Sequence, residues 1–213
     1  MRDEFRGDLA EISRMLVTMA EAVRVAMRKA TEALLQADRP GAEHVVDRDR
    51  EIDALYRIVE DKVYDVVARQ APVASDLRVV LTALHVGGDL ERMGDLAEHV
   101  AKAALRRHPA AAVPPELTAV VQSMGEVADH LAGKIGTALS TLDAVAAAQL
   151  ERDDDAMDDL HRQLFKVLVS PDWPHGVETA VDAALLGRFY ERYADHAVNV
   201  GKHVVFLVTG ESV

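Results

Sequence analysis

The 213-residue sequence has no cysteine, and aromatic residues make up only 4% of it. The lack of cysteine excludes disulfides, thiolate metal sites and thiol nucleophiles together. The sequence also lacks any run that approaches the ~18 apolar residues of a membrane span. Its charged N-terminal stretch lacks the apolar core of a signal peptide. We therefore expect a soluble, cytoplasmic protein.

Cationic residues are outnumbered by acidic ones. Lys and Arg total 24 against 36 Asp and Glu, which gives a formal net charge of −12. Nucleic acids and anionic membranes attract cationic surfaces, so we expect no nucleic-acid partner and no direct membrane contact. Hydrophobic residues still make up 49% of the chain. A core with so few aromatic rings must be aliphatic and rich in alanine, which favours packed helices over β-sandwiches or barrels.

Apolar residues recur at helical spacing along most of the sequence, which predicts an all-α fold of six helices. The third helix is expected to begin at a Ser75-Asp76 N-cap and to run to about Arg107. Gly87 and Gly94 inside it predict close approach of a neighbouring helix, because glycine is otherwise unfavourable there. Turn-forming residues predict interruptions between the helices at residues 38–41, 71–72, 109–115 and 170–176. The apolar stripe of the fourth helix reaches Leu142, and the fifth helix is expected over about residues 150–169.

The second group of three helices matches the first. A shift of 105 residues aligns the first two helices with the fourth and fifth, and a shift of 100 aligns the third with the sixth. Eight of the 23 positions from 83 to 105 then carry identical residues. This repetition predicts two tandem three-helix bundles related by internal duplication, covering residues 1–109 and 114–213.

Four acidic pairs are spaced four residues apart, one in the second and one in the third helix of each copy. They are Asp49 with Asp53, Glu91 with Asp95, Asp154 with Asp158, and Glu191 with Asp195. Residues i and i+4 share a helix face, so packing of the second helix against the third would gather four carboxylates in each bundle. A bound cation would relieve their repulsion, and oxygen ligands suit Mg²⁺, Mn²⁺, iron or Zn²⁺.

The alternative is that these carboxylates lie on a solvated face, with Arg92 and Arg192 as counter-charges. Pairs at this spacing are common on acidic helices, and Asp61 with Asp65 is one that has no counterpart in the other copy. Two pairs occur in each copy at equivalent positions, and this recurrence strengthens the case for metal. Both interpretations stay open.

No motif for catalysis is present. The sequence has no Walker-type glycine loop, no G-x-S-x-G and no HExxH. A di-iron oxidase needs Glu-x-x-His on two helices, and the nearest match, Asp158-Asp159-Leu160-His161, occurs once. His196 points about 100° away from its neighbour Asp195 on a helix, which predicts a core or polar contact for it. We expect no enzymatic activity.

Four segments together resemble a known family. They are Arg69-Gln70-Ala71-Pro72-Val73-Ala74-Ser75-Asp76-Leu77-Arg78, Leu90-Glu91-Arg92-Met93-Gly94-Asp95, its echo Glu191-Arg192-Tyr193-Ala194-Asp195-His196, and the terminal Val208-Thr209-Gly210-Glu211. In these segments, and in the duplicated three-helix plan, the chain resembles the PhoU family of phosphate-signalling regulators. The resemblance extends over essentially the whole sequence.

The resemblance implies that the D/E-xxx-D motifs bind metal clusters, with iron or zinc expected first and Mg²⁺ or Mn²⁺ as further candidates. Carried over by position, the ligands are Asp49, Asp53, Glu91, Asp95, Asp154, Asp158, Glu191 and Asp195. It also implies a homodimeric, non-catalytic adaptor that represses the phosphate regulon. Such an adaptor links the ATPase subunit of the phosphate ABC transporter to a sensor histidine kinase.

Four side chains are weaker candidates for partner contact, namely Asp76, Arg78, Arg92 and Arg192. For Arg78 an ion pair at the start of its helix is equally expected. The second copy has Ser170-Pro171-Asp172-Trp173 where the first has the Arg-Gln-x-Pro loop, so contact through that loop is confined to one half. Two other functions stay open: a scaffold of the same fold without metal, and a metal-dependent phosphoesterase.

Overall fold

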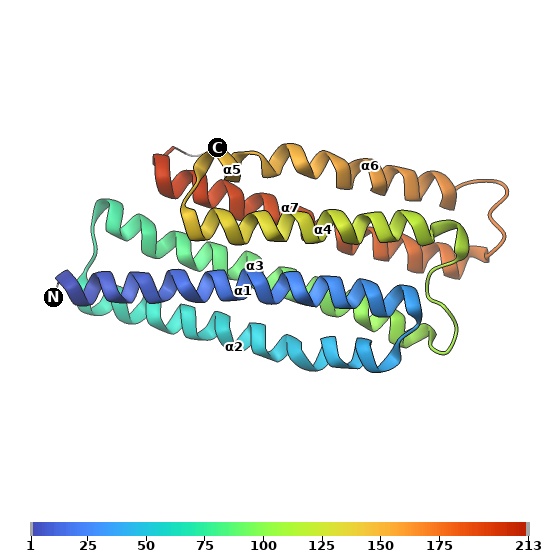
Figure 1. Ribbon diagram of the computed structural model, residues 1–213, viewed down its shortest axis with the longest axis horizontal. Coiled ribbons are helices and arrows are strands. Elements are labelled where there is room, and N and C mark those ends of the chain that lie inside the picture. The colour runs from blue at the N-terminus through green and yellow to red at the C-terminus, as the bar shows by residue number, and fades with distance from the viewer. Residues whose placement is uncertain (1, 212–213) are drawn as a thin grey trace.

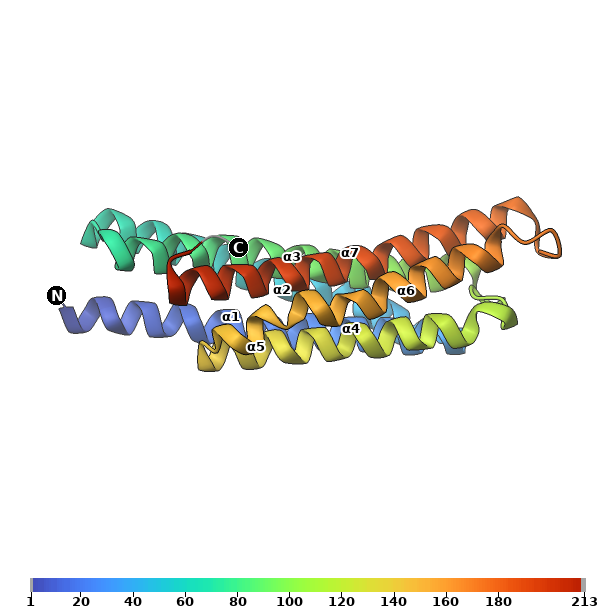
Figure 2. The ribbon, with the colours of Figure 1, turned by 90° about the horizontal axis from the view of Figure 1, so that it is seen from above.

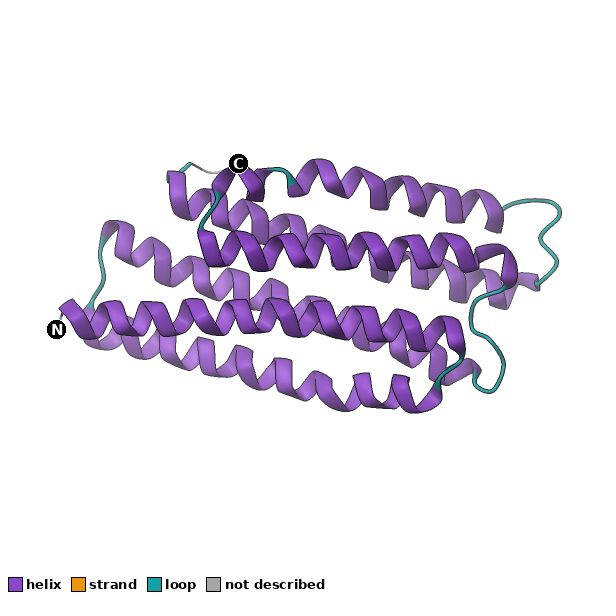
Figure 3. Cartoon of the chain, in the orientation of Figure 1, coloured by secondary structure: helices purple, strands orange, loops and turns teal. Residues whose placement is uncertain are grey.

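The structure is a computed structural model that describes residues 2–211, with side chains from Glu4 onward. Its helices are α1 (Arg2–Gln36), α2 (Arg39–Gln70), α3 (Ala74–Arg107), α4 (Pro115–Thr141), α5 (Ala144–Ala148), α6 (Leu150–Leu168) and α7 (Gly176–Thr209). No strand occurs among these residues (Figure 3). The all-α prediction is confirmed, with six long helices and the short α5 as an addition.

Two helix starts differ from the prediction. Only residues 37 and 38 separate α1 from α2, and Pro40 lies in the first turn of α2, where its missing N–H needs no partner. The predicted Ser75-Asp76 N-cap is wrong, because α3 begins one residue earlier, after Val73, and has no side-chain cap. Val73, the residue before the helix, is extended, and its carbonyl accepts a hydrogen bond from the Asp76 N–H at 3.1 Å.

The predicted gap before the fifth long helix is itself partly helical. The Asp143 carboxylate accepts hydrogen bonds from the backbone N–H groups of Val145 and Ala146, at 2.9 and 3.0 Å. These bonds satisfy amide donors that the first turn of a helix leaves free. The single turn of α5 follows from this cap, although five residues are too few to show apolar periodicity.

The long helices form two three-helix bundles that lie side by side. Helices α1, α2 and α3 pack together in one bundle, and α4, α6 and α7 pack together in the other, with α5 against α7. Between the bundles, α1 packs on α4 and α3 packs on α7 (Figures 1 and 2). Figure 1 shows that the paired helices of this seam run in opposite directions.

Buried tyrosines and one ion pair join the two bundles across the seam. From α7, the hydroxyl of Tyr190 lies 2.7 Å from that of Thr31, and Tyr193 donates a hydrogen bond to the Val23 carbonyl at 3.1 Å. Arg24 of α1 donates two hydrogen bonds to the Asp129 carboxylate of α4, at 3.0 and 2.9 Å. The remaining core is largely aliphatic, as the composition predicts.

Glycines mark close helix contacts within each bundle. A Cβ atom at Gly87 would lie 3.1 Å from the Tyr56 ring of α2, and one at Gly187 would lie 3.1 Å from the His161 ring of α6. The predicted close approach of a neighbouring helix is therefore confirmed. It brings α2 against α3, and α6 against α7, along the faces that carry the acidic pairs. Within residues 2–211, each helix is too polar or too short to span a bilayer.

Candidate metal centres

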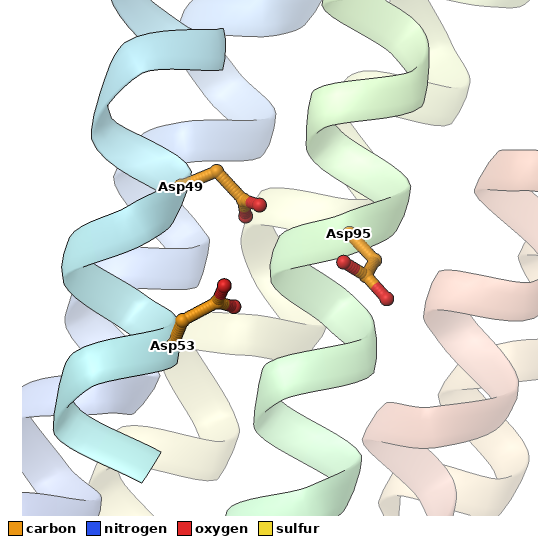
Figure 4. Close-up of side chains that lie close together, drawn as sticks. All are labelled: Asp49, Asp53 and Asp95. Atoms are coloured by element: carbon orange, nitrogen blue, oxygen red, sulfur yellow. The ribbon is translucent and has the colours of Figure 1, made fainter. Parts of the chain in front are cut away.

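Three of the predicted carboxylates in the first bundle meet between α2 and α3. Asp49, Asp53 and Asp95 each place one carboxylate oxygen within 4.8 Å of the other two. Figure 4 shows Asp49 and Asp53 extending from successive turns of α2 toward α3, which carries Asp95. All three side chains are half-buried. The spacing of four residues on α2 thus produces the convergence that the sequence predicts.

A glycine makes room for this acidic cluster. A Cβ atom at Gly94, next to Asp95 on α3, would lie 3.1 Å from two carbon atoms of Ile52 and 3.2 Å from Asp49 Oδ1. Because glycine has no Cβ, the Asp49 carboxylate can lie close against the backbone of α3. The small residue therefore sets the distance between the two acidic faces.

The electrostatics of the first cluster are unfavourable without a cation. Burial, and after it the negative charges of neighbouring acidic residues, together raise the pKa of Asp49 to about 6. Burial and the charge of Asp95 also raise the pKa of Glu91, which is the fourth predicted ligand. Arg92 offsets part of this repulsion, because its Nη1 donates a hydrogen bond to Asp95 Oδ2 at 2.8 Å. One guanidinium cannot neutralise four carboxylates, so positive charge is still in deficit.

Glu98 is an acidic neighbour that the sequence analysis missed. It lies on α3 seven residues after Glu91, which is two helical turns on the same face. Among charged neighbours, its carboxylate contributes most to the raised pKa of Asp49, second only to burial. Lys102 pairs with it at 2.5 Å. The signal that could have found it is this i+7 spacing, but Val198 stands at the matching position of the second copy.

The second bundle holds a more open acidic cluster between α6 and α7. Asp154 and Glu191 are half-buried, whereas Asp158 and Asp195 are exposed. The pKa of Asp154 is raised to about 6. Burial is the largest cause, and the negative charges of Asp158, Asp195 and Glu191 come next. Within residues 2–211, only the first cluster brings three ligand atoms within 4.8 Å of one another. The four predicted side chains are therefore neighbours here without closing around one point.

Two buried polar atoms beside the second cluster have no hydrogen-bond partner among the described residues. They are Asp154 Oδ1 and His161 Nε2, both on α6. The positive charge of a protonated His161 would lower the pKa of Glu191, so the imidazole lies within electrostatic range of the cluster. Buried polar atoms are normally paired, and a cation bound at either atom would satisfy that atom. An imidazole beside carboxylates suits zinc or iron, so the residues present fit the expected metals.

The counter-charge in the second cluster is not the predicted one. Arg188 donates a hydrogen bond to Glu191 from one helical turn earlier, whereas Arg192 is exposed. Arg188 lies three positions before Glu191, which is the spacing that joins Arg92 to Asp95 in the first cluster, and Arg192 makes no ion pair among the described residues. The expectation that Arg192 matches Arg92 as a counter-charge is therefore wrong.

Two of the four candidate partner residues, Asp76 and Arg78, lie near the start of α3. Asp76 is exposed in the first turn of the helix. Arg78 is half-buried over the ring of Phe206, with its Cζ 5.7 Å from the ring centroid. Among residues 2–211 it has no ion pair, so the expected pair at the helix start is wrong.

His196 makes the polar contact predicted for it. Its Nδ1 lies 2.8 Å from Asp89 Oδ1, which links α7 to α3 across the seam. Burial alone would raise the pKa of Asp89, but hydrogen bonds from His196 and His203 outweigh it and hold that pKa below its usual value. These groups satisfy one another, and the charge of a protonated His196 would also lower the pKa of Glu91 in the first cluster.

Comparisons with known proteins cover nearly the whole chain. A family model described as the PhoU domain matches residues 16–104 and 121–204. The chain is 46% identical to phosphate-specific transport system accessory protein PhoU homolog 2 of Mycobacterium tuberculosis, over 99% of each chain. It is 44% identical to PhoU homolog 1 of Mycobacterium leprae, over 99% of this chain and 95% of that protein.

Solved structures share the arrangement of helices. The crystal structure of PhoU from Pseudomonas aeruginosa superposes with a TM-score of 0.90 at 26% identity, covering 97% of this chain and 100% of the other. The phosphate transport system regulatory protein PhoU from Streptococcus pneumoniae superposes with a TM-score of 0.87 at 25% identity, covering 98% and 99%. The double bundle described above is therefore the same fold.

Proposed function

Because the chain belongs to the PhoU family, we propose that it is a non-catalytic accessory protein of phosphate-specific transport. In this role it binds metal ions and restrains phosphate uptake and phosphate-regulon signalling. The names of its mycobacterial and streptococcal relatives support the link to phosphate transport. The observation that carries the metal-binding part is the convergence of Asp49, Asp53 and Asp95 on one point between two helices.

The proposed ligands are the eight paired carboxylates and one added imidazole. They are Asp49, Asp53, Glu91 and Asp95 in the first cluster, and Asp154, Asp158, Glu191 and Asp195 with His161 in the second. Iron or zinc is the proposed occupant, because the second cluster offers nitrogen as well as oxygen. The oxygen-only first cluster also suits Mg²⁺ or Mn²⁺. Bound cations would neutralise the clusters and hold α2 against α3 and α6 against α7.

The proposed partners are the ATPase subunit of the phosphate transporter and a phosphate-sensing histidine kinase, with a homodimer as the working assembly. Exposed Asp76 at the start of α3 offers a contact that the second copy lacks, because Asp172 and Trp173 replace that loop. The two proposed repeats, 1–109 and 114–213, are supported by the two separate matches to one family model. Each repeat then supplies one acidic cluster.

Metal analysis of the purified full-length protein tests the ligands. We expect protein prepared without chelator to contain iron or zinc, and the double variant Glu91→Ala plus Asp95→Ala to lose the metal of the first cluster. Asp61→Ala plus Asp65→Ala is the matched control, because it removes an equally spaced acidic pair outside both clusters. Unchanged metal content in the first variant would contradict the assignment.

Thermal unfolding separates the metal-binding adaptor from a scaffold that lacks metal. A ligand that binds only the native state must raise stability, so EDTA should lower the melting temperature of the wild-type protein. His161→Gln should reduce this EDTA effect, because it removes the nitrogen ligand of the second cluster. Equal melting temperatures with and without EDTA would favour the scaffold.

Two further measurements test the adaptor role. A pull-down from phosphate-replete cells should recover the transporter ATPase or the histidine kinase with the wild-type protein. A phosphatase screen with added Mn²⁺ should give no turnover, and hydrolysis that depends on Asp49 would instead identify a metal-dependent phosphoesterase.

A further inference from the structure

A hollow of about 630 Å³ lies on the seam between the first half of α3 and the last part of α7. Its lining combines cationic, polar and apolar side chains from these two helices. They are Leu77, Arg78, Leu81, His85, Lys202 and Phe206, together with Ala74, Thr82, Asn199 and His203. No carboxylate belongs to this lining, although the chain as a whole carries a formal charge of −12. We call it the α3/α7 hollow.

Arg78 is the cation in the α3/α7 hollow whose charge is not matched. Its Nε is buried without a hydrogen-bond partner among residues 2–211. Packing holds the guanidinium in place, because it lies over the Phe206 ring and against Gly210, where a Cβ atom would overlap Nη1. A buried donor without a partner destabilises the protein. The site is therefore arranged to receive an acceptor.

Lys202 and the imidazoles of His85 and His203 also line the α3/α7 hollow. Lys202 Nζ lies 3.2 Å from Glu151, whose side chain is largely exposed. His203 lies 3.4 Å from Asp89 and stacks on His85, with ring centroids 5.2 Å apart. The exposed Lys202–Glu151 pair contributes little, so Lys202 can still donate hydrogen bonds to a ligand. His203 holds Asp89 through Nε2, which leaves its second ring nitrogen for a ligand.

The equivalent place at the other end of the seam carries acidic side chains of its own. Glu178 and Asp182 of α7 match Arg78 and Thr82 of α3 under the shift of 100 residues. At that end of the seam, Arg107 of α3 pairs with Glu178 at 3.0 Å and donates a hydrogen bond from Nε to Asp182 at 2.8 Å. One end of the seam is thus closed by ion pairs, whereas at the other end Arg78 has no acidic partner among residues 2–211.

We propose that the α3/α7 hollow binds a phosphoryl group, carried by free phosphate or by a phosphate ester. Arginine matches the geometry of phosphate oxygens, and lysine adds a point charge. Thr82, Asn199 and the imidazoles supply further donors, while Leu77, Leu81 and Phe206 offer an apolar wall for the body of an ester. The volume falls in the range of small-molecule sites. This inference goes beyond the proposed function and does not depend on the metal clusters.

Calorimetric titration of the full-length, EDTA-treated protein with inorganic phosphate and with AMP tests the proposal. Removal of metal ensures that phosphate held by a cation does not contribute, so failure here is distinct from failure of the metal assignment. At constant ionic strength we expect saturable binding at one site per chain. Equal affinity for both probes would identify free phosphate as the ligand, and tighter binding of AMP would identify an ester.

Matched variants locate the binding. Arg78→Gln and Lys202→Ala should each weaken binding about tenfold or more, because each removes a charged hydrogen bond. Lys102→Ala removes the duplicated lysine, which pairs with Glu98, and should bind phosphate like the wild-type protein. If Arg78→Gln weakens the end of α7, two other measurements still test the site. They are the affinity of Lys202→Ala for phosphate and the change in the NMR signals of His85 and His203 when phosphate is added to the wild-type protein.

Absence of saturable binding at millimolar phosphate and AMP would overturn the proposal. Equal losses in Lys102→Ala and Lys202→Ala would also overturn it, because they would show a response to net charge and not to a site.

Discussion

Individual carboxylates show how strongly burial in a helical groove changes their chemistry. An unperturbed Asp loses its proton near pH 3.8, whereas burial and neighbouring acidic charges raise the pKa of Asp49 to about 6. Between these pH values the native chain therefore holds a proton that the unfolded chain has released. The free energy of unfolding then falls as pH rises through this window, which is the opposite of the usual behaviour of a salt-bridged Asp.

Asp49→Asn tests this behaviour in EDTA. The variant has no charge to bury, so it should be more stable than the wild-type protein at pH 8. The difference should be on the order of 1 kcal/mol once solvent screening is allowed for, and it should vanish near pH 4. Urea unfolding at both pH values measures it, with Asp47→Asn as an exposed control on the same helix. A gain of the same size at both pH values would contradict this explanation.

The packing of a helix against its neighbours depends on its glycines as well as on its side chains. A Cβ atom at Gly201 of α7 would lie 2.8 Å from the Ala147 carbonyl oxygen and 2.7 Å from a Leu150 methyl. The short helix α5 can therefore lie against α7 only at a glycine. By contrast, no atom lies within 4 Å of a Cβ at Gly136 in α4.

Alanine at these two glycines should have opposite effects. Gly201→Ala should destabilise the protein by about 1–3 kcal/mol, because the backbone of α5 has to move. Gly136→Ala should stabilise it by up to about 1 kcal/mol, because alanine favours the helix and meets nothing. Thermal or urea unfolding of both variants measures the difference. Equal effects would show that helix propensity, and not packing, decides at position 201.

The elements were predictable from sequence to the extent that their signals are local. Apolar spacing identifies the six long helices, and the recurrence of i, i+4 acids identifies both clusters. Glu98 and His161 were missed because only features present in both copies were followed, and each stands in one copy alone. The Arg78–Phe206 and Arg24–Asp129 contacts depend on how the bundles dock, and residues so far apart in the chain give no periodic signal of it.

The two bundles behave as one body because α1 packs on α4 and α3 packs on α7 over much of their length (Figure 2). The buried hydroxyls of Tyr190 and Tyr193 and the Arg24–Asp129 pair all cross this seam. Separation of the bundles would expose these groups together with the apolar faces around them. We therefore expect a single cooperative unfolding transition for the whole chain.

Charge reversal at the seam tests this docking. Arg24→Asp or Asp129→Arg alone places like charges opposite each other and should cost about 1–2 kcal/mol. The double variant should recover part of the loss; Glu21 and Arg28, at 3.9 and 4.0 Å from the original pair, limit the recovery. Trp173 fluorescence and helical circular dichroism should report the same midpoint in each variant. Separate midpoints would mean that the bundles unfold independently.

Arg24 and Asp129 differ by 105 positions, the offset that relates the first helices of the two copies. The two residues that face each other are thus the same residue of the ancestral repeat, and they lie on an approximate twofold axis. Two identical subunits meeting on that axis would confront arginine with arginine or aspartate with aspartate. Within one polypeptide the two sides can carry opposite charges. This difference favours pairing of unlike halves and disfavours pairing of two first halves or two second halves.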